Sequence, residues 1–351
     1  MLAGLALVLG VAGDAVSTLV TTRRRRGRRW PTPVYYRWTW RTWRAIALRM
    51  DPERREGFLG VYGPLSLLGL LVFWVVLLVG GWAVVWWGLR PSVSGVGGYL
   101  DAVYFAGVGF FTVGFGDLLP TGGLTRMLVL VEAFMGLVTM ALVIGYLPTL
   151  YSAYARRELQ LLALDDLSDE PTTPVTFLEA SYANGGLQGV AAAFADWERW
   201  CDEVYDTHTA YPMLALFRSR QPGQHWLTAL AVVMDAAAMA LSTFDSGTAG
   251  PAARLWRRST RLIQHFRQLP AVGQKAGGGV PGTAEAWFRD AYQRLERLGH
   301  PVRPYEQAWD QYRRRRDAFY PKLVGATEQL LVPMEFRHQT ARFDLSGPEG
   351  R

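Results

Sequence analysis

Six consecutive residues have the types and spacing needed to bind a cation that has lost its water shell: Thr112-Val113-Gly114-Phe115-Gly116-Asp117. Successive backbone carbonyls point toward one axis only when alternate residues adopt left-handed conformations, which glycine reaches without a steric penalty. Gly114 and Gly116 alternate with Val113 and Phe115 in this way. We therefore expect cation ligands from the carbonyl oxygens of Thr112, Val113, Gly114 and Phe115, with the Thr112 hydroxyl as the innermost oxygen and the side chains of Val113 and Phe115 directed away from the axis.

Two long apolar segments flank this run and would hold it in a membrane. Residues 65–89 contain no charge, and at 1.5 Å per residue they reach roughly 37 Å, enough to cross a hydrocarbon core of about 30 Å with some tilt. Residues 127–150 carry only one charge, Glu132, and the sequence predicts a second helix over 124–150. These patterns predict an all-α membrane protein.

The segment between the two spans predicts a pore loop. A helix over 101–111, with Asp101 favourable at its N-terminus, is too short to cross the membrane. The filter run 112–117 follows it as irregular backbone at membrane depth, which lipid does not tolerate unless protein buries it or it lines a water-filled path. A single chain carries one such loop, so four copies must assemble around the axis to complete each carbonyl ring.

The N-terminal region predicts a further membrane helix and the orientation of the chain. Residues 1–22 are apolar apart from Asp14, to which we assign a helix-packing role, and the positive charge follows the apolar run, unlike in a secretory signal. Residues 23–56 hold 12 Arg against three acids. Such a basic segment favours the cytoplasmic side, so we expect a multi-pass protein of the cell membrane with its N-terminus outside. The cluster Arg23–Arg29 then serves as an orientation and lipid-headgroup anchor.

Residues 23–63 form a basic linker that is cytoplasmic or interfacial. Tyr36, Trp40, Trp43, Ala47 and Met50 recur at helical spacing. This pattern fits either an amphipathic helix on the inner membrane surface or an aromatic-rich helix packed on the protein. The sequence leaves both alternatives open.

Residues 155–340 predict a helical cytosolic domain, and residues 341–351 a flexible tail. This part holds 23 basic and 23 acidic residues, so it is electrically neutral. Residues 226–243 nearly reach spanning length, but Asp235 and the flanking arginines favour a buried helix. The Arg313–Arg316 run lies among acidic residues and predicts a solvated face rather than a nucleic-acid site. We expect Cys201 to be a structural buried thiol. The further predicted helices span 175–182, 187–207, 252–268, 283–299 and 305–332.

Enzymatic functions find little support in the sequence. It has no G-x-x-x-x-G-K-[ST], H-E-x-x-H or G-x-S-x-G motif, and its five histidines lack metal-ligand spacing. We therefore expect no catalytic residue and no cofactor. A nucleotide-binding regulatory domain of the kind that needs a glycine-rich phosphate loop is also excluded.

We place a pore domain at residues 64–154, and residues 65–150 within it resemble potassium channels of the two-span pore-loop superfamily. The usual filter TVGYGD appears here as TVGFGD. The resemblance implies that Asp117 supports the filter from behind and that Tyr104 and Phe105 belong to the aromatic cuff around it. Gly109 and Phe111 depart from the family pattern, in which threonine is frequent at both positions, and this places the usual partners of Asp117 in question.

The same resemblance assigns roles on the inner helix. Gly136 lies 22 residues after Gly114, the family's spacing for a gating hinge, and Glu132 resembles an acid that many bacterial channels carry before that hinge. From the residues themselves, we expect Glu132 to hydrogen-bond within the protein. Counting from Gly136 at helical period gives the expected cavity-lining and gate residues, which are Leu137, Met140, Ile144 and Pro148. A hinge at Gly136 predicts that alanine there changes channel opening and leaves ion selectivity intact.

A weaker resemblance extends over the whole chain, to bacterial potassium-channel-like proteins in which the inner helix ends in YLP and a basic stretch, here Tyr146-Leu147-Pro148 and Arg156-Arg157. We expect a homotetrameric potassium channel that contacts lipid, binds no nucleic acid and is gated through its cytosolic domain by an unknown stimulus. The alternatives are a weakly selective cation channel and a non-conducting membrane-tethered interaction protein.

Overall fold

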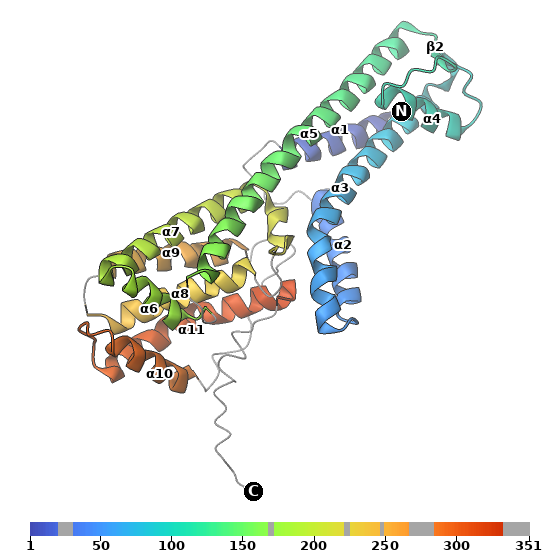
Figure 1. The fold of residues 1–351 in the computed structure, drawn as a ribbon. Coiled ribbons are helices and arrows are strands. Elements are labelled where there is room, and N and C mark those ends of the chain that lie inside the picture. Colours follow the sequence, from blue (N-terminus) through green and yellow to red (C-terminus); the bar gives the residue numbers. More distant parts are fainter. Residues whose placement is uncertain (20–30, 168–171, 221–224, 246–248, 267–283, 333–351) are drawn as a thin grey trace. The chain divides into compact units, whose positions relative to one another are not determined.

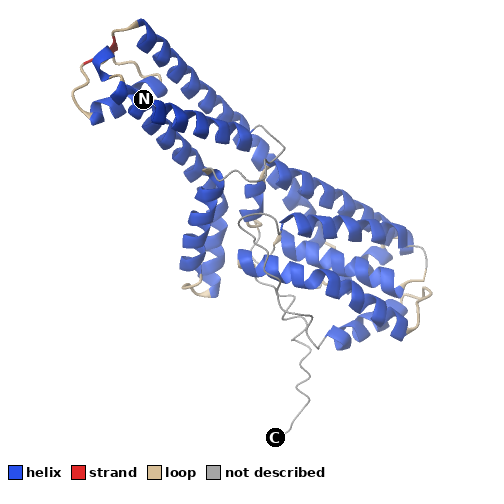
Figure 2. Cartoon of the chain, turned by 180° about the vertical axis from the view of Figure 1, so that it is seen from behind, coloured by secondary structure: helices blue, strands red, loops and turns tan. Residues whose placement is uncertain are grey.

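The chain is an all-α membrane protein built from two compact units. A computed structural model describes residues 1–19, 31–167, 172–220, 225–245, 249–266 and 284–332 (Figure 1). The first unit comprises residues 1–49 and 61–153, and the second comprises residues 50–60 and 154–351. Within the described ranges, the only strands are the two-residue strands β1 (Val93–Ser94) and β2 (Leu119–Pro120), drawn in red in Figure 2.

Four described helices are long and apolar enough to cross a membrane. They include α1 (Leu2–Leu19), most of α3 (Pro52–Gly88), α5 (Gly123–Asp165) and α8 (Trp226–Thr243). The short apolar helix α4 (Tyr99–Phe110) lies between α3 and α5 along the chain, one or two residues from the predicted range. The turn η1 (Arg90–Ser92) follows α3.

Both long helices extend beyond the ranges predicted from hydropathy. Helix α3 begins at Pro52 and continues through Pro64, whereas we predicted 65–89. Helix α5 continues through Pro148 to Asp165, whereas we predicted an end at residue 150. The residues after 150 are polar but rich in Ala, Leu, Arg, Glu and Gln, which are good helix formers. The end of the apolar stretch near residue 150 is therefore not the end of the helix.

Helix α1 packs closely on α3 through glycine. A Cβ atom on Gly4 would lie 2.5 Å from the carbonyl oxygen of Gly81, so only glycine fits at this crossing. Asp14 is buried at 4% exposure, and its carboxylate accepts hydrogen bonds from the Trp74 indole N–H at 3.2 Å and the Thr32 hydroxyl at 2.5 Å. The acid therefore links α1 to α3 and to the start of α2 (Thr32–Ala47).

Helix α2 places its aromatic face against α3. The Tyr35 hydroxyl donates to the Ser66 carbonyl oxygen at 2.9 Å, and the rings of Trp40 and Trp43 lie 4.9 and 5.5 Å from the ring of Tyr62. Of the two alternatives for this segment, these contacts favour an aromatic-rich helix packed on the protein. The predicted anchor Arg23–Arg29 lies outside the described residues.

The second unit is a helical bundle around α8 (Figure 1). Its other helices are α6 (Pro174–Ala183), α7 (Gly186–Ala210), η2 (Pro212–Leu216), α9 (Ala249–Phe266), α10 (Ala284–Glu296) and α11 (Tyr305–Leu330). Helix α8 has 89% of its residues buried within the protein, mainly against α6, α9 and α11. Its apolar character is therefore explained by its position in the core of this unit. The predicted tail 341–351 lies outside the described residues.

A buried polar chain crosses the core of the second unit. The Tyr312 hydroxyl donates to Asp235 Oδ1 at 2.8 Å and accepts from Arg316 Nη1 at 3.0 Å. Burial lowers the pKa of Arg316, but the neighbouring Tyr312 and Asp235 raise it more, so the guanidinium stays charged. The interpretation of the Arg313–Arg316 run as a solvated face is therefore wrong for Arg316, which is 1% exposed, because its guanidinium lies in the core and bonds to Tyr312.

Cys201 is buried on α7, with its Sγ 3.6 Å from Ser259 Oγ on α9. Burial raises the pKa of its thiol to about 12. The thiol is therefore protonated at neutral pH, consistent with a structural role.

Candidate functional site

The backbone of the loop after α4 alternates between left-handed and ordinary conformations. Thr112, Gly114 and Gly116 have φ angles of 55°, 65° and 79°, and no other residue between 111 and 117 has a positive φ. The two glycines reach this region freely, whereas a non-glycine residue there costs about 1–3 kcal/mol. The alternation argued from the glycines thus includes Thr112, which sequence reasoning did not identify because threonine rarely adopts this conformation.

The loop is tied to the C-terminal end of α4. The backbone N–H groups of Phe111, Thr112 and Val113 donate to the carbonyls of Gly107, Gly109 and Val108, at 2.9, 3.1 and 2.9 Å. These bonds satisfy carbonyls that a helix end leaves without partners. The backbone therefore passes directly from the pore helix into the alternating segment.

Hydrogen bonds also fix the two ends of the segment that contains α4 and the filter run. At the N-terminus of α4, the Asp101 carboxylate accepts the backbone N–H groups of Gly97 and Gly98 at 2.9 and 2.7 Å, the cap role that suits an acid there. Strand β1 pairs antiparallel with β2, so Ser94 lies opposite Leu119. The chain between residues 93 and 120 is therefore closed into a loop by its own backbone.

Two aromatic residues of α4 hold different positions around the loop. The Tyr104 hydroxyl of α4 lies near the carboxylate of Asp117, at the end of the filter run. Phe105 is buried, and its ring meets the ring of Trp86 edge-on at 5.0 Å. Asp117 thus has Tyr104 of α4 as a neighbour, although Gly109 and Phe111 depart from the family pattern.

Glu132 lies behind the pore helix and makes use of Gly109. Its side chain is fully buried, and Oε2 accepts the Trp86 indole N–H at 2.8 Å. A Cβ atom on Gly109 would lie 3.0 Å from the same oxygen, so the threonine common at this position would crowd the acid. Within the described residues, Oε1 has no hydrogen-bond partner. The absence of a side chain at Gly109 therefore makes room for the carboxylate of Glu132.

Gly136 brings α5 directly against the end of α4. A Cβ atom at this position would lie 1.8 Å from the carbonyl oxygen of Phe110 and 2.9 Å from its carbonyl carbon. Glycine is therefore required for this approach, whatever its part in bending. Sequence reasoning placed Gly136 by its distance from the filter, and the packing partner Phe110 could not be read from that spacing.

The residues expected to line a cavity lie on an exposed side of α5. Leu137, Met140 and Ile144 are 58%, 53% and 68% exposed, and Pro148 is exposed as well. In the filter run, Val113 and Phe115 are 50% and 70% exposed. So many exposed apolar side chains are uncommon on a surface that faces water, and they mark an interface or a lipid contact.

Comparison with known proteins agrees with this geometry. Residues 70–152 match the family model described as "Ion channel". This match spans most of the predicted outer helix, α4, the filter run and the membrane part of α5. The N-terminal helix and the second unit lie outside it.

Two relatives are similar over parts of the chain. The "Uncharacterized membrane protein YdjJ" of Bacillus subtilis (strain 168) is 24% identical over 204 residues, which is 57% of this chain and 58% of that protein. The "Two pore potassium channel a" of Oryza sativa subsp. japonica is 39% identical over 95 residues, which is 26% of each chain. The chain thus spans little more than half of the first relative and about a quarter of the second. No solved structure matches it.

The described residues offer no alternative metal centre. Among them, no group of three or more His, Cys, Asp or Glu side chains could hold a metal ion.

Proposed function

We propose that the chain is one subunit of a homotetrameric potassium-selective channel, in which K⁺ passes through four copies of the loop at 112–116. The observation that carries the proposal is the alternation of positive φ at Thr112, Gly114 and Gly116, because this conformation turns successive carbonyls toward one side. The carbonyl oxygens of Thr112, Val113, Gly114 and Phe115 would replace the water shell of the ion. The "Ion channel" match over residues 70–152 supports ion transport, and the similarity to a plant potassium channel supports the choice of ion.

The exposure of the filter run supports assembly. Every residue from 111 to 117 is exposed in the single chain, although the run follows a largely apolar helix at membrane depth. Phe115, 70% exposed, would lie in water or lipid unless another copy covers it. A fourfold arrangement covers these side chains and completes each carbonyl ring, since one loop supplies one quarter of a ring.

Helix α5 supplies a route from the second unit to the pore. It is one continuous helix from Gly123 to Asp165 and belongs to both units. Near its end, Arg157 donates to the carbonyls of Leu214 and Phe217, each at 3.0 Å, and its own carbonyl accepts the Trp200 indole N–H at 3.2 Å. A rearrangement of the second unit would therefore act on the lower part of α5, and through it on the expected gate row from Leu137 to Pro148.

The decisive experiment is ion flux through purified protein in liposomes. We expect uptake of K⁺ to exceed uptake of Na⁺ strongly, and the mass of the purified particle to equal four chains. Equal uptake of both ions would instead establish a weakly selective cation channel. No uptake of either ion by a correctly assembled tetramer, with and without the second unit, would leave the tethered interaction protein as the function.

A further inference from the structure

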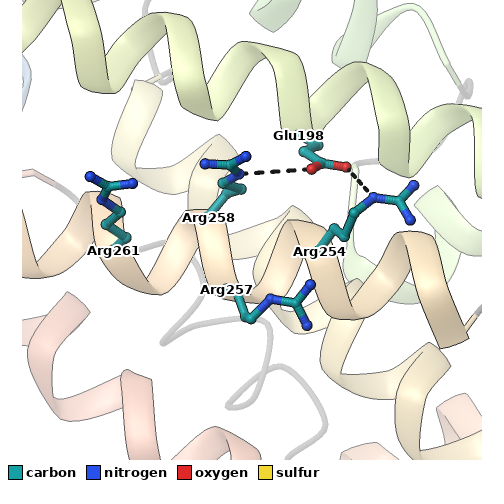
Figure 3. A pocket seen from close by; sticks show the side chains of 5 residues that line it. All are labelled: Glu198, Arg254, Arg257, Arg258 and Arg261. Atoms are coloured by element: carbon teal, nitrogen blue, oxygen red, sulfur yellow. Dashed lines mark hydrogen bonds and ion pairs between the residues drawn. The ribbon is translucent and has the colours of Figure 1, made fainter.

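The second unit carries an arginine-lined pocket on α9 that the proposed pore does not use. A pocket of about 220 Å³ is lined by Glu198 of α7 and by four arginines of α9, which are Arg254, Arg257, Arg258 and Arg261 (Figure 3). A single water needs only about 10–15 Å³ in this measure, so the pocket has room for a polyatomic ligand.

The four arginines occupy one side of α9 by their spacing. Positions 254, 257, 258 and 261 follow the i, i+3, i+4, i+7 pattern, which confines four guanidinium groups to about 100° of the helix circumference. Like charges at this spacing repel one another and destabilise a helix. The opposite side of α9 is buried through residues such as Leu255 and Leu262. The four arginines therefore destabilise α9 through mutual repulsion unless negative charge nearby compensates for them.

Carboxylates of the neighbouring α7 neutralise only part of this charge. Glu198 Oε2 accepts from Arg254 Nε at 2.9 Å, and Glu198 Oε1 lies 3.8 Å from Arg258 Nε. Asp202 lies 3.3 Å from Arg258 Nη1. The site thus holds four arginines and two carboxylates, which leaves an excess of two positive charges.

The two remaining arginines have no carboxylate partner in the described part of the chain. Arg261 lies over the ring of Tyr205 at 4.7 Å, a contact that orients the guanidinium and leaves its charge in place. Arg257 makes no ion pair among the described residues and leaves α9 on the side away from Glu198 (Figure 3). Both side chains are exposed and free to close on a ligand.

We propose that this pocket binds a phosphate-bearing anion that carries at least two negative charges. Guanidinium groups bind phosphate oxygens through paired N–H donors, a geometry that lysine cannot reproduce. An excess of two positive charges matches a diphosphate or a phosphate monoester dianion. Arg254 and Arg258, held by Glu198, form the fixed side of the site, and Arg257 and Arg261 form the adaptable side. A soluble diphosphate and a lipid headgroup share this chemistry.

The test is calorimetric titration of the purified full-length protein with inorganic pyrophosphate at low ionic strength, repeated with short-chain phosphatidic acid, whose phosphate monoester can carry two negative charges. The double variant Arg257→Ala/Arg261→Ala removes the two arginines that hold no ion pair, so it leaves the ion pairs between α7 and α9 in place. We expect its affinity to fall by about tenfold or more. Arg297→Ala is the matched control, because Arg297 is exposed, bonds only within its own turn and lies outside the pocket.

Each outcome decides between the alternatives. Binding of pyrophosphate alone assigns the site to a soluble anion, and binding of the lipid assigns it to a headgroup; both support the proposal when the double variant loses them and Arg297→Ala does not. Absence of both interactions in the unaltered protein overturns it. An equal loss in Arg297→Ala also overturns it, because the attraction is then a property of the whole basic surface. Thermal unfolding shows whether the double variant folds, and the single variant Arg257→Gln repeats the measurement with the least perturbation.

Discussion

Replacing Gly136 with alanine is the sharpest test of how the pore is assembled. The added Cβ would lie 1.8 Å from the Phe110 carbonyl oxygen, whereas real Cβ contacts are essentially never shorter than 3.0 Å. The two backbones must therefore separate by at least the difference, 1.2 Å. The oxygen is a backbone atom and the position of the Cβ is fixed by the backbone, so no side-chain rotation can relieve the contact. Overpacking of this kind costs about 1–3 kcal/mol, and more where the backbone itself must move.

The position of Phe110 determines what this displacement does. Phe110 is the last residue of α4 and lies two residues before Thr112, the first filter residue with a positive φ. A shift of the helix end is therefore transmitted to the carbonyl ligands. We expect Gly136→Ala to reduce K⁺ uptake by liposomes and to lower the preference for K⁺ over Na⁺, in contrast to the hinge interpretation, which predicts intact selectivity.

Gly145→Ala is the matched control for this experiment. Gly145 lies on the same helix, and a Cβ atom there would meet nothing within 4 Å in the single chain. Its substitution changes the helix propensity as much as the substitution of Gly136 does, so it isolates the effect of the contact. Unchanged selectivity in Gly136→Ala, with only the open probability altered, would refute the packing argument and restore the hinge.

Three further outcomes are expected. Gly114→Ala should abolish selective K⁺ uptake, because alanine is strained at a φ of 65°, whereas Gly107→Ala on the pore helix should preserve it; equal uptake by both would contradict the filter assignment. In a Cys201→Ser background, a membrane-impermeant thiol reagent applied from outside should label Ser94→Cys and should not label a cysteine on the exposed side of α9; the reverse pattern would invert the topology. Burial, aided by a nearby arginine, holds the pKa of His208 well below its usual 6.5. As the pH falls below about 6.5, the unfolded chain therefore gains a proton at this residue and the folded chain does not. The unfolding temperature of the second unit should drop on acidification, and His208→Gln should weaken that drop.

The left-handed conformation of Gly114 and Gly116 was predicted from the sequence, and its physical basis explains why. The preference of Gly114 and Gly116 for positive φ is a property of the residues themselves and needs no neighbours. The left-handed conformation of Thr112 is imposed by bonds to the end of α4, such as Thr112 N–H to the Gly109 carbonyl, and by the alternation that follows. The conformation of the glycines could thus be predicted from the residues themselves, whereas that of Thr112, which depends on its neighbours, could not.

The same distinction applies to the helices. Hydropathy predicted the membrane parts of α3 and α5, because lipid requires apolar side chains over a fixed length. It could not predict that α5 runs on to Asp165, since helix formation there depends on propensity and on packing within the second unit. The burial of the helix over 226–243 was predicted from Asp235 and the flanking arginines, but Tyr312, which bonds to Asp235, lies 77 residues away and could not be inferred from that segment.

Glu132 shows how two unusual residues can be read together. Taken singly, Gly109 is a departure from a common filter-helix pattern, and Glu132 is a costly acid within a membrane helix. Each becomes intelligible through the other, because the missing side chain at 109 gives the carboxylate room and Trp86 supplies the donor that its Oε2 atom requires. Gly136 repeats the same logic one turn further along α5, where a missing side chain admits the Phe110 carbonyl. Helix α5 therefore packs on α4 through two glycine-dependent contacts, so the residues that position the backbone of 112–117 extend well beyond those six.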